Sequence, residues 1–114
     1  MIALLVAVAT LMLGPSSNGH SYTVAPQTRI VVTLPSNQTT GFSWHLAARP
    51  DGHVVKLVSH RYVAPKTKRV GAGGKEIWRF RAVGAGSTRL RLVYEQAGQM
   101  QPVGRRYSVK IHVR

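Results

Sequence analysis

The sequence predicts an all-β fold, an immunoglobulin-like antiparallel β-sandwich of seven to eight strands without a disulfide. Apolar and polar residues alternate with a period of two over several short runs, the pattern of half-buried strands. Clusters of Gly, Pro, Ser and Asn separate these runs about every 8 to 12 residues, as in sandwiches. The 114 residues include no cysteine, so the core alone must stabilise the domain.

The alternation predicts each strand in turn. The strongest runs are residues 29–34, 75–83, 88–94 and 107–113, and the last alternates most regularly. Weaker strands are expected at residues 21–24, 42–47, 54–58 and 60–63. Trp78 lies on the inward phase of its run and is assigned to the core. For Trp44, core packing and support of the neighbouring loop remain equal alternatives.

The N-terminus has the features of a secretory leader. Residues 2–13 are apolar except for Thr10, and small residues follow them. The run is too short to cross a bilayer core of about 30 Å. No Lys or Arg precedes it. We therefore expect a signal peptide over residues 1–19, a single domain over residues 20–114, and a secreted or periplasmic location without stable membrane insertion after removal of the leader.

The chain is strongly basic, with 16 Lys and Arg against 3 Asp and Glu, a formal net charge of +13. Arg79, Arg81, Arg89 and Arg91 lie on the outward phases of two consecutive runs. If those strands pair, they form a basic patch that could meet phosphates. The aromatic residues of these runs face inward, so stacking on bases, and hence nucleic-acid binding, is not expected. A solvated face is the favoured interpretation, and an anionic surface is the alternative partner.

Catalysis is not expected. The three carboxylates, Asp51, Glu76 and Glu95, fall in separate segments, and no pattern brings two of them to one bond. The five histidines show no spacing typical of a metal site, and a solvated structural role is favoured for each. We therefore expect no enzyme activity, cofactor or metal.

Two loops carry the functional information. One has a polar, turn-forming tip over residues 37–41, between two apolar strands. The other, residues 70–74, presents nearly bare backbone, which suits close approach to another main chain. Either loop taken alone could be a simple hairpin connection.

Together, in this order, the loops resemble those of the chagasin family of cysteine-peptidase inhibitors. That family's first loop is Asn-Pro-Thr-Thr-Gly followed by an aromatic residue and, two positions on, Trp. Its second loop is Gly-x-Gly-Gly. The first is matched by Asn37, Thr39, Thr40, Gly41, Phe42 and Trp44, with Gln38 in place of Pro, and the second by Gly71, Ala72, Gly73 and Gly74.

The third loop of the family, Arg-Pro-Trp, is absent from the corresponding residues 95–104. Met100 and Pro102 are candidates for an apolar contact there, and neither is assigned to the missing Trp. Because a buried Trp is a frequent hot spot, its loss predicts weaker inhibition or a shifted target range.

The resemblance implies a reversible inhibitor of papain-like cysteine peptidases, and we expect the protein to be a monomer. Three loops would form a wedge that occludes the active-site cleft, with Thr40 nearest the thiolate and the glycine loop pairing its backbone with the substrate-binding strand. The alternative is a non-inhibitory module of the same fold that uses a basic sheet face to bind an anionic surface or partner.

Overall fold

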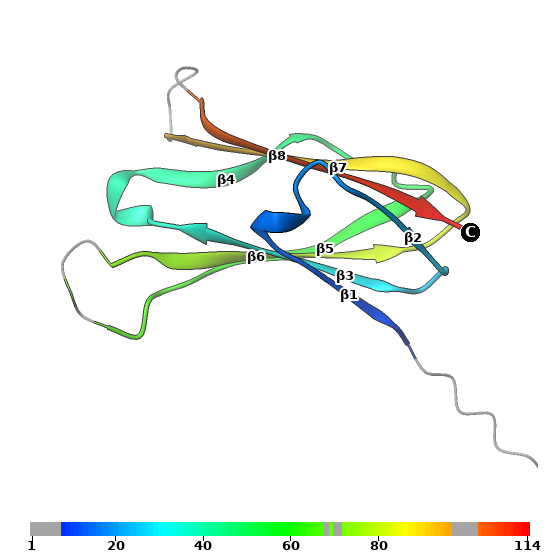
Figure 1. Cartoon of the computed structure of the whole chain (residues 1–114), viewed down its shortest axis with the longest axis horizontal. Helices are drawn as coiled ribbons and strands as arrows, with labels where there is room; N and C mark the ends of the chain where they lie inside the picture. Colours follow the sequence, from blue (N-terminus) through cyan, green and yellow to red (C-terminus); the bar gives the residue numbers. More distant parts are fainter. Residues whose placement is uncertain (1–7, 68, 70–71, 97–102) are drawn as a thin grey trace, which may run out of the picture.

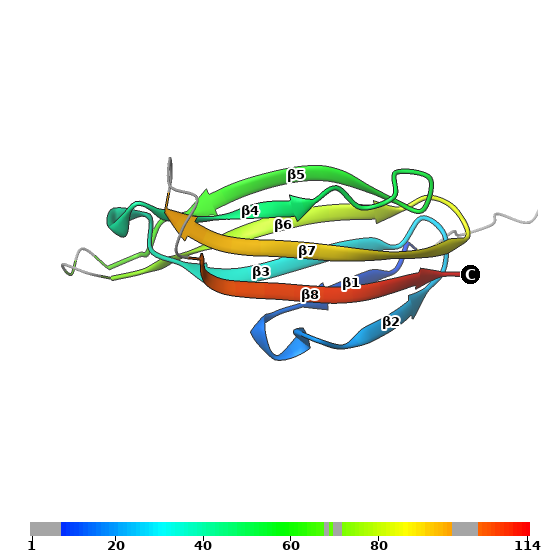
Figure 2. The same cartoon turned by 90° about the horizontal axis from the view of Figure 1, so that it is seen from above.

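The computed structural model describes residues 8–67, 69, 72–96 and 103–114, and these residues form two four-stranded sheets packed face to face (Figures 1 and 2). We call the sheet of order β1-β3-β6-β5 sheet A and the sheet of order β2-β8-β7-β4 sheet B. In chain order the strands are β1 (Thr10–Leu13), β2 (Ser21–Val24), β3 (Arg29–Ser36), β4 (Phe42–Ala48), β5 (Val55–Val63), β6 (Gly74–Ala82), β7 (Gly86–Gln96) and β8 (Val103–Val113). The predicted β-sandwich is confirmed.

The core lies between the sheets and uses the inward phases that the alternation predicts. Trp78 is 5% exposed, which confirms its assignment to the core. Each large aliphatic or aromatic side chain buried here contributes about 1.5–3 kcal/mol. The central buried residues are Ile30, Val32 and Leu34 from β3, Trp78, Phe80 and Ala82 from β6, Leu90 and Leu92 from β7, and Val109, Ile111 and Val113 from β8.

A strand lies inside the segment expected to be the leader. β1 pairs in parallel with β3, and its Leu13 is buried in the core. A 3-10 turn, η1 (Pro15–Ser17), then carries the chain to sheet B, where β2 pairs in parallel with β8. The Tyr107 hydroxyl donates a hydrogen bond of 2.9 Å to the Gly14 carbonyl. Residues 10–19 therefore belong to the sandwich, and the two parallel pairs lie at sheet edges while the central pairs are antiparallel.

β5 is one strand where two short ones, at residues 54–58 and 60–63, were expected. Its register with β6 shifts between Leu57 and Ser59, which is the signature of a β-bulge. The extra residue reverses the alternation, so the sequence pattern breaks although the strand continues. The shift places His60 opposite Trp78, facing inward.

The expected basic patch is not formed, because β6 and β7 do not pair. β6 belongs to sheet A and β7 to sheet B, and residues 83–85 connect the two sheets. Arg79 and Arg81 therefore lie on one outer face of the sandwich, and Arg89 and Arg91 on the other.

The helical elements among the described residues are three-residue 3-10 turns, and no described helix has the length and apolar character to cross a membrane.

Candidate functional site

One end of the sandwich, at the left in Figure 1, gathers the loop segments singled out in the sequence. Ser36, the last residue of β3, pairs with Gly74, the first residue of β6. Phe42, the first residue of β4, pairs with Gln96, the last residue of β7. The 37–41 loop, the glycine segment and the β7–β8 connection therefore start from the same end. Three predicted contact residues lie outside the described part of the chain, namely Gly71, Met100 and Pro102.

The 37–41 loop is closed by its own hydrogen bonds. The Asn37 side chain accepts hydrogen bonds from the Thr39 amide at 3.2 Å and the Thr39 hydroxyl at 2.5 Å. The Thr40 hydroxyl donates to the Asn37 carbonyl at 2.6 Å. Gly41 ends the 3-10 turn η2 (Gln38–Thr40) with a φ of 81°, which favours glycine. Residues 38–41 are exposed, so the loop presents an ordered, polar tip.

Beneath this loop lies a fully buried carboxylate. Glu76 of β6 is 0% exposed, and its Oε2 accepts hydrogen bonds from the Ser36 hydroxyl at 2.5 Å and the Trp44 amide at 2.9 Å. Ser36 precedes the loop and Trp44 follows it. The Glu76 carboxylate therefore connects both ends of the loop to β6.

The other oxygen of Glu76 contacts a histidine. His60 Nε2 lies 2.6 Å from Glu76 Oε1, and the His60 ring stacks on Trp78 with ring centroids 3.8 Å apart. The His60 side chain is 32% exposed, so it keeps the solvent contact expected from the sequence, but its pairing with Glu76 was not expected. The inward phase of Glu76, two residues before Trp78 on the same strand, was the available signal: a buried carboxylate needs a partner.

Aromatic rings support the loop from the side of sheet B. The Tyr94 hydroxyl accepts a hydrogen bond of 2.9 Å from the Asn37 amide. The Tyr94 ring lies 5.4 Å from that of Phe42 and 5.1 Å from that of Trp44, centroid to centroid. Trp44 is 3% exposed and its Nε1 donates to the Pro35 carbonyl at 2.9 Å. Both alternatives for Trp44 are therefore correct: it packs in the core and supports the loop.

The two described glycines of the second loop differ in what they do. A Cβ at Gly74 would overlap the Val63 carbonyl oxygen and the Tyr62 ring, so glycine is required there by the packing of β5 on β6. A Cβ at Gly73 would make only ordinary contacts, 3.6 Å from the Asn37 Cβ. Gly73 therefore lies beside the first loop, whereas the need for glycine at 74 is structural. The Ala72 amide donates a hydrogen bond of 3.1 Å to the Arg69 carbonyl.

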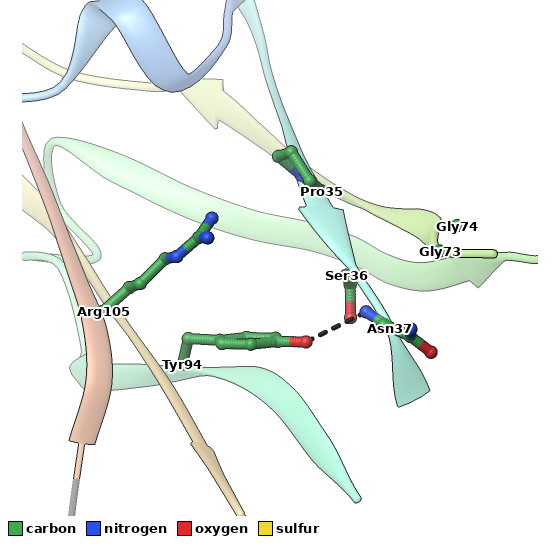
Figure 3. Close-up of a pocket in the computed structure, with 7 residues that line it drawn as sticks. All are labelled: Pro35, Ser36, Asn37, Gly73, Gly74, Tyr94 and Arg105. Atoms are coloured by element: carbon green, nitrogen blue, oxygen red, sulfur yellow. Dashed lines mark hydrogen bonds between the residues drawn. The ribbon is translucent and has the colours of Figure 1, made fainter. Parts of the chain in front are cut away.

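A shallow pocket of about 240 Å³ separates these segments (Figure 3). The Arg105 side chain extends into it from β8, and Tyr94 reaches across it to Asn37. Arg105 was not singled out in the sequence, because it follows the loop in which the Arg-Pro-Trp motif was sought. The pocket is lined by Pro35, Ser36, Asn37, Gly73, Gly74, Tyr94 and Arg105.

The site offers polar tips and backbone groups rather than catalytic chemistry. No three His, Asp or Glu side chains in the described part of the chain converge as a metal site would require. Its exposed groups are hydroxyls, amides and one guanidinium, which suit recognition of another protein's main chain.

The sequence profile described as chagasin family peptidase inhibitor matches residues 23–113, which include both loops. The chain belongs to the chagasin family. Chagasin from Trypanosoma cruzi is 34% identical over 80 residues, covering 68% of this chain and 73% of that protein.

Solved structures share the fold of this chagasin-family chain. A cysteine protease inhibitor from Entamoeba histolytica superimposes with a TM-score of 0.83 at 16% identity, covering 94% of this chain and 97% of that one. A second neighbour, PbICP-C, solved in complex with falcipain-2, has a TM-score of 0.58 at 10% identity, covering 97% and 94%. The chagasin family consists of inhibitors, which confirms that this protein is not an enzyme.

Proposed function

We propose that this protein reversibly inhibits papain-like cysteine peptidases by inserting the loop end of the sandwich into the active-site cleft. The observation that carries the proposal is the 37–41 loop, which is exposed at its tip and held at its base by Glu76 and Tyr94. Membership of a family of peptidase inhibitors supports it. The complex of the structural neighbour PbICP-C with falcipain-2 also supports it.

The geometry explains how a small loop could bind tightly. The hydrogen bonds of Asn37 with Thr39 and Thr40 order the loop before it meets a partner. Less conformational entropy is then lost on binding, which leaves more of the contact free energy as affinity. Thr40 would lie nearest the peptidase thiolate and exclude substrate without offering a peptide bond in register for cleavage.

The neighbouring segments would extend the contact on both sides of the loop. The backbone at Gly73 is placed next to Asn37 and can pair with an extended strand of the peptidase. On the other side, Arg105 is exposed and supplies a cation close to the connection that lacks Arg-Pro-Trp. We include Arg105 in the proposed contact surface for this reason.

The apolar run at residues 2–13 supports a further proposal, that the protein is exported and acts as a secreted or periplasmic monomer. Cleavage after residue 19, where the leader is expected to end, would remove β1, which pairs with β3. Fractionation of cells expressing the tagged chain, with mass analysis of the mature protein, tests location and boundary together.

The inhibitory proposal is tested by titrating papain with the purified full chain. We expect stoichiometric inhibition that persists in about 0.5 M NaCl, because hydroxyl and backbone groups of the 37–41 loop and Gly73 make most of the proposed contact, and salt screens only the part made by Arg105. Thr40→Arg places a long charged side chain where the loop enters the cleft, and should raise the inhibition constant at least about a hundredfold.

Thr23→Arg is the matched control, since it makes the same change at an exposed position on β2. It should leave the inhibition constant within about twofold of the parent value. Absence of inhibition by the parent chain, or equal inhibition by the parent and Thr40→Arg, would contradict the proposal.

A further inference from the structure

The outer face of sheet A carries a groove of about 420 Å³ crossed by basic side chains. Arg29 of β3 and Arg81 of β6 are directly opposite each other, and Lys56 of β5 is opposite Arg81 on the other side. Three cations therefore lie in one row across three strands spaced about 4.8 Å apart. We call this site the arginine groove; its lining includes Arg29, Val31, Val58, Arg79 and Arg81.

The fold supplies no side-chain carboxylate to neutralise this row. The three acidic residues of the chain are all described and all lie elsewhere. Asp51 accepts a hydrogen bond from the His53 amide before β5, Glu76 is buried facing the core, and Glu95 is on β7 in sheet B. Like charges directly opposite in a sheet are destabilising. An external anion on this face would relieve a repulsion that the fold retains.

Exposed aliphatic side chains accompany the charges. Val58, at the irregularity in β5, is 56% exposed, and Met12 of β1 is 66% exposed. Met12 pairs with Val31, which lines the groove. Among the described residues, the large exposed hydrophobic side chains all lie on or next to these two edge strands of sheet A: Val8, Met12, Leu57 and Val58.

The combination of basic and exposed aliphatic side chains favours one class of anionic partner over another. Single-stranded nucleic acids are bound by exposed aromatic rings, whereas the one aromatic residue lining the groove, Phe80, has its side chain 1% exposed in the core. Basic side chains beside exposed aliphatic ones match the phosphates and the upper acyl region of an anionic bilayer.

We propose that the outer face of sheet A docks on an anionic phospholipid surface, with headgroup phosphates in the arginine groove and Val58 and Met12 at the acyl boundary. The 37–41 loop stands at one end of the sheets rather than on this face (Figure 1). A docked molecule would therefore keep its inhibitory end free, and the inhibitor would be concentrated at the membrane.

The test is sedimentation of the full chain with vesicles of phosphatidylglycerol mixed with phosphatidylcholine, against vesicles of phosphatidylcholine alone. We expect binding to the anionic vesicles only, weakening as salt rises. The triple variant Arg29→Gln, Arg79→Gln, Arg81→Gln should lower the partition coefficient about a hundredfold, since each basic residue near such a surface contributes about fivefold. Because it removes like-charge repulsion, this variant should unfold at a higher temperature than the parent.

The matched control is Arg89→Gln, Arg91→Gln, Lys110→Gln, which makes the same change in net charge on the exposed face of sheet B. These side chains would lie beyond a Debye length of about 8 Å from the docked bilayer, so partition should fall less than about threefold. Equal losses in the two triple variants, or no binding to anionic vesicles, would overturn the proposal.

The variant Val58→Ser tests whether the anionic partner is a bilayer or another polyanion. It keeps every charge and should lower vesicle partition about threefold, because an aliphatic contact with the acyl boundary is lost. Unchanged partition of Val58→Ser, together with tighter binding of the parent chain to a DNA fragment than to vesicles, would assign the groove to a polyanion and overturn membrane docking. Inhibition of papain should be the same in all these variants.

Discussion

At the scale of single residues, Glu76 links the core to the loop end. Its two oxygens contact groups from three other strands: Ser36 of β3, Trp44 of β4 and His60 of β5. A buried carboxylate is costly unless its hydrogen-bonding capacity is filled. Here His60 contacts one oxygen, and the residues that enter and leave the 37–41 loop bond the other. The position of the loop and the stability of the core therefore depend on the same side chain.

Replacing Glu76 should affect stability and inhibition together. Glu76→Ala leaves the Ser36 hydroxyl and the Trp44 amide without their acceptor, and should lower the free energy of unfolding by about 3 kcal/mol. Because the loop loses its anchor, the inhibition constant should also rise at least about tenfold. Chemical denaturation and papain titration at the same temperature measure the two effects.

Leu90→Ala provides the comparison, since Leu90 is fully buried in the core on β7, four positions before Tyr94, whose hydroxyl bonds the loop. It should cost about 2–5 kcal/mol of stability while leaving the inhibition constant unchanged. If both variants weaken inhibition equally, Glu76 has no specific role in positioning the loop.

Gln38 is a second residue whose replacement is expected to change both stability and inhibition. It is the first residue of η2, where proline is favoured, and Asn37 before it has φ −118° and ψ 91°, outside the helical region that a following proline disfavours. Gln38→Pro should stabilise the folded chain by about 0.4–1 kcal/mol and tighten inhibition up to about fivefold, by restricting the unbound loop.

Thermal unfolding and papain titration of Gln38→Pro test this expectation. Gln27→Pro is the unfavourable counterpart, because Gln27 has a φ of 73° that proline cannot adopt. A destabilising effect of Gln38→Pro comparable to that of Gln27→Pro would show that the turn differs from the one described.

At the scale of elements, the N-terminal segment decides where the domain begins. β1 adds the edge strand of sheet A, and η1 carries the chain across to the edge of sheet B. Leu13 is 4% exposed, and Gly14 accepts the hydrogen bond of the Tyr107 hydroxyl. A parallel edge strand of four residues is short, yet its Leu13 is part of the core between the sheets.

Two truncations test this role. Removing residues 1–8 should leave the free energy of unfolding within about 0.5 kcal/mol of the full chain, because β1 remains intact. Removing residues 1–19 should lower it by more than about 2 kcal/mol, since Leu13 and the Gly14 contact are lost. Urea denaturation of the two proteins measures the difference. Equal stability would place the domain boundary at residue 20, as the leader pattern predicts.

At the scale of the whole molecule, stability rests on two sheets closed over one apolar core, without a disulfide and against a net charge of +13. Packing of the two sheets buries the polar side chain of Tyr107, which is 3% exposed. Burial raises the pKa of its hydroxyl from 10.0 to about 12, partly offset by the Ser17 side chain. The folded protein therefore keeps this proton at pH values where the unfolded chain loses it.

This difference predicts an alkaline loss of stability. Below about pH 10 both states are protonated and the contribution of Tyr107 is fully present. Between pH 10 and about 12 only the unfolded state ionises, so up to about 2 kcal/mol is lost as pH rises through this window.

Tyr107→Phe removes the titration and should flatten the decline in this window, at a cost of about 1 kcal/mol at neutral pH for the lost bond to Gly14. Urea midpoints of both proteins from pH 8 upward measure it. Parallel pH profiles for the two proteins would show that the Tyr107 pKa is not raised by folding.

Local periodicity was sufficient to predict the sandwich, most of its strands and its core, because a strand's inward residues repeat every second position whatever its partners. The 37–41 loop could likewise be recognised as a functional candidate, since its turn residues are contiguous. Which strands share a sheet could not be predicted in this way. β6 and β7 are consecutive and equally basic on their outward phases, yet they lie in different sheets, so their arginines face opposite sides.

Only the tertiary structure brought Glu76 to Ser36, 40 residues earlier in the chain, and Tyr94 to Asn37, 57 residues earlier. Residues 10–13, the end of the apolar run, likewise form an edge strand through their pairing with β3. The physical reason is common to these cases. Alternation records which side of a strand meets the core, whereas pairing and side-chain hydrogen bonds between distant segments depend on how the sheets assemble.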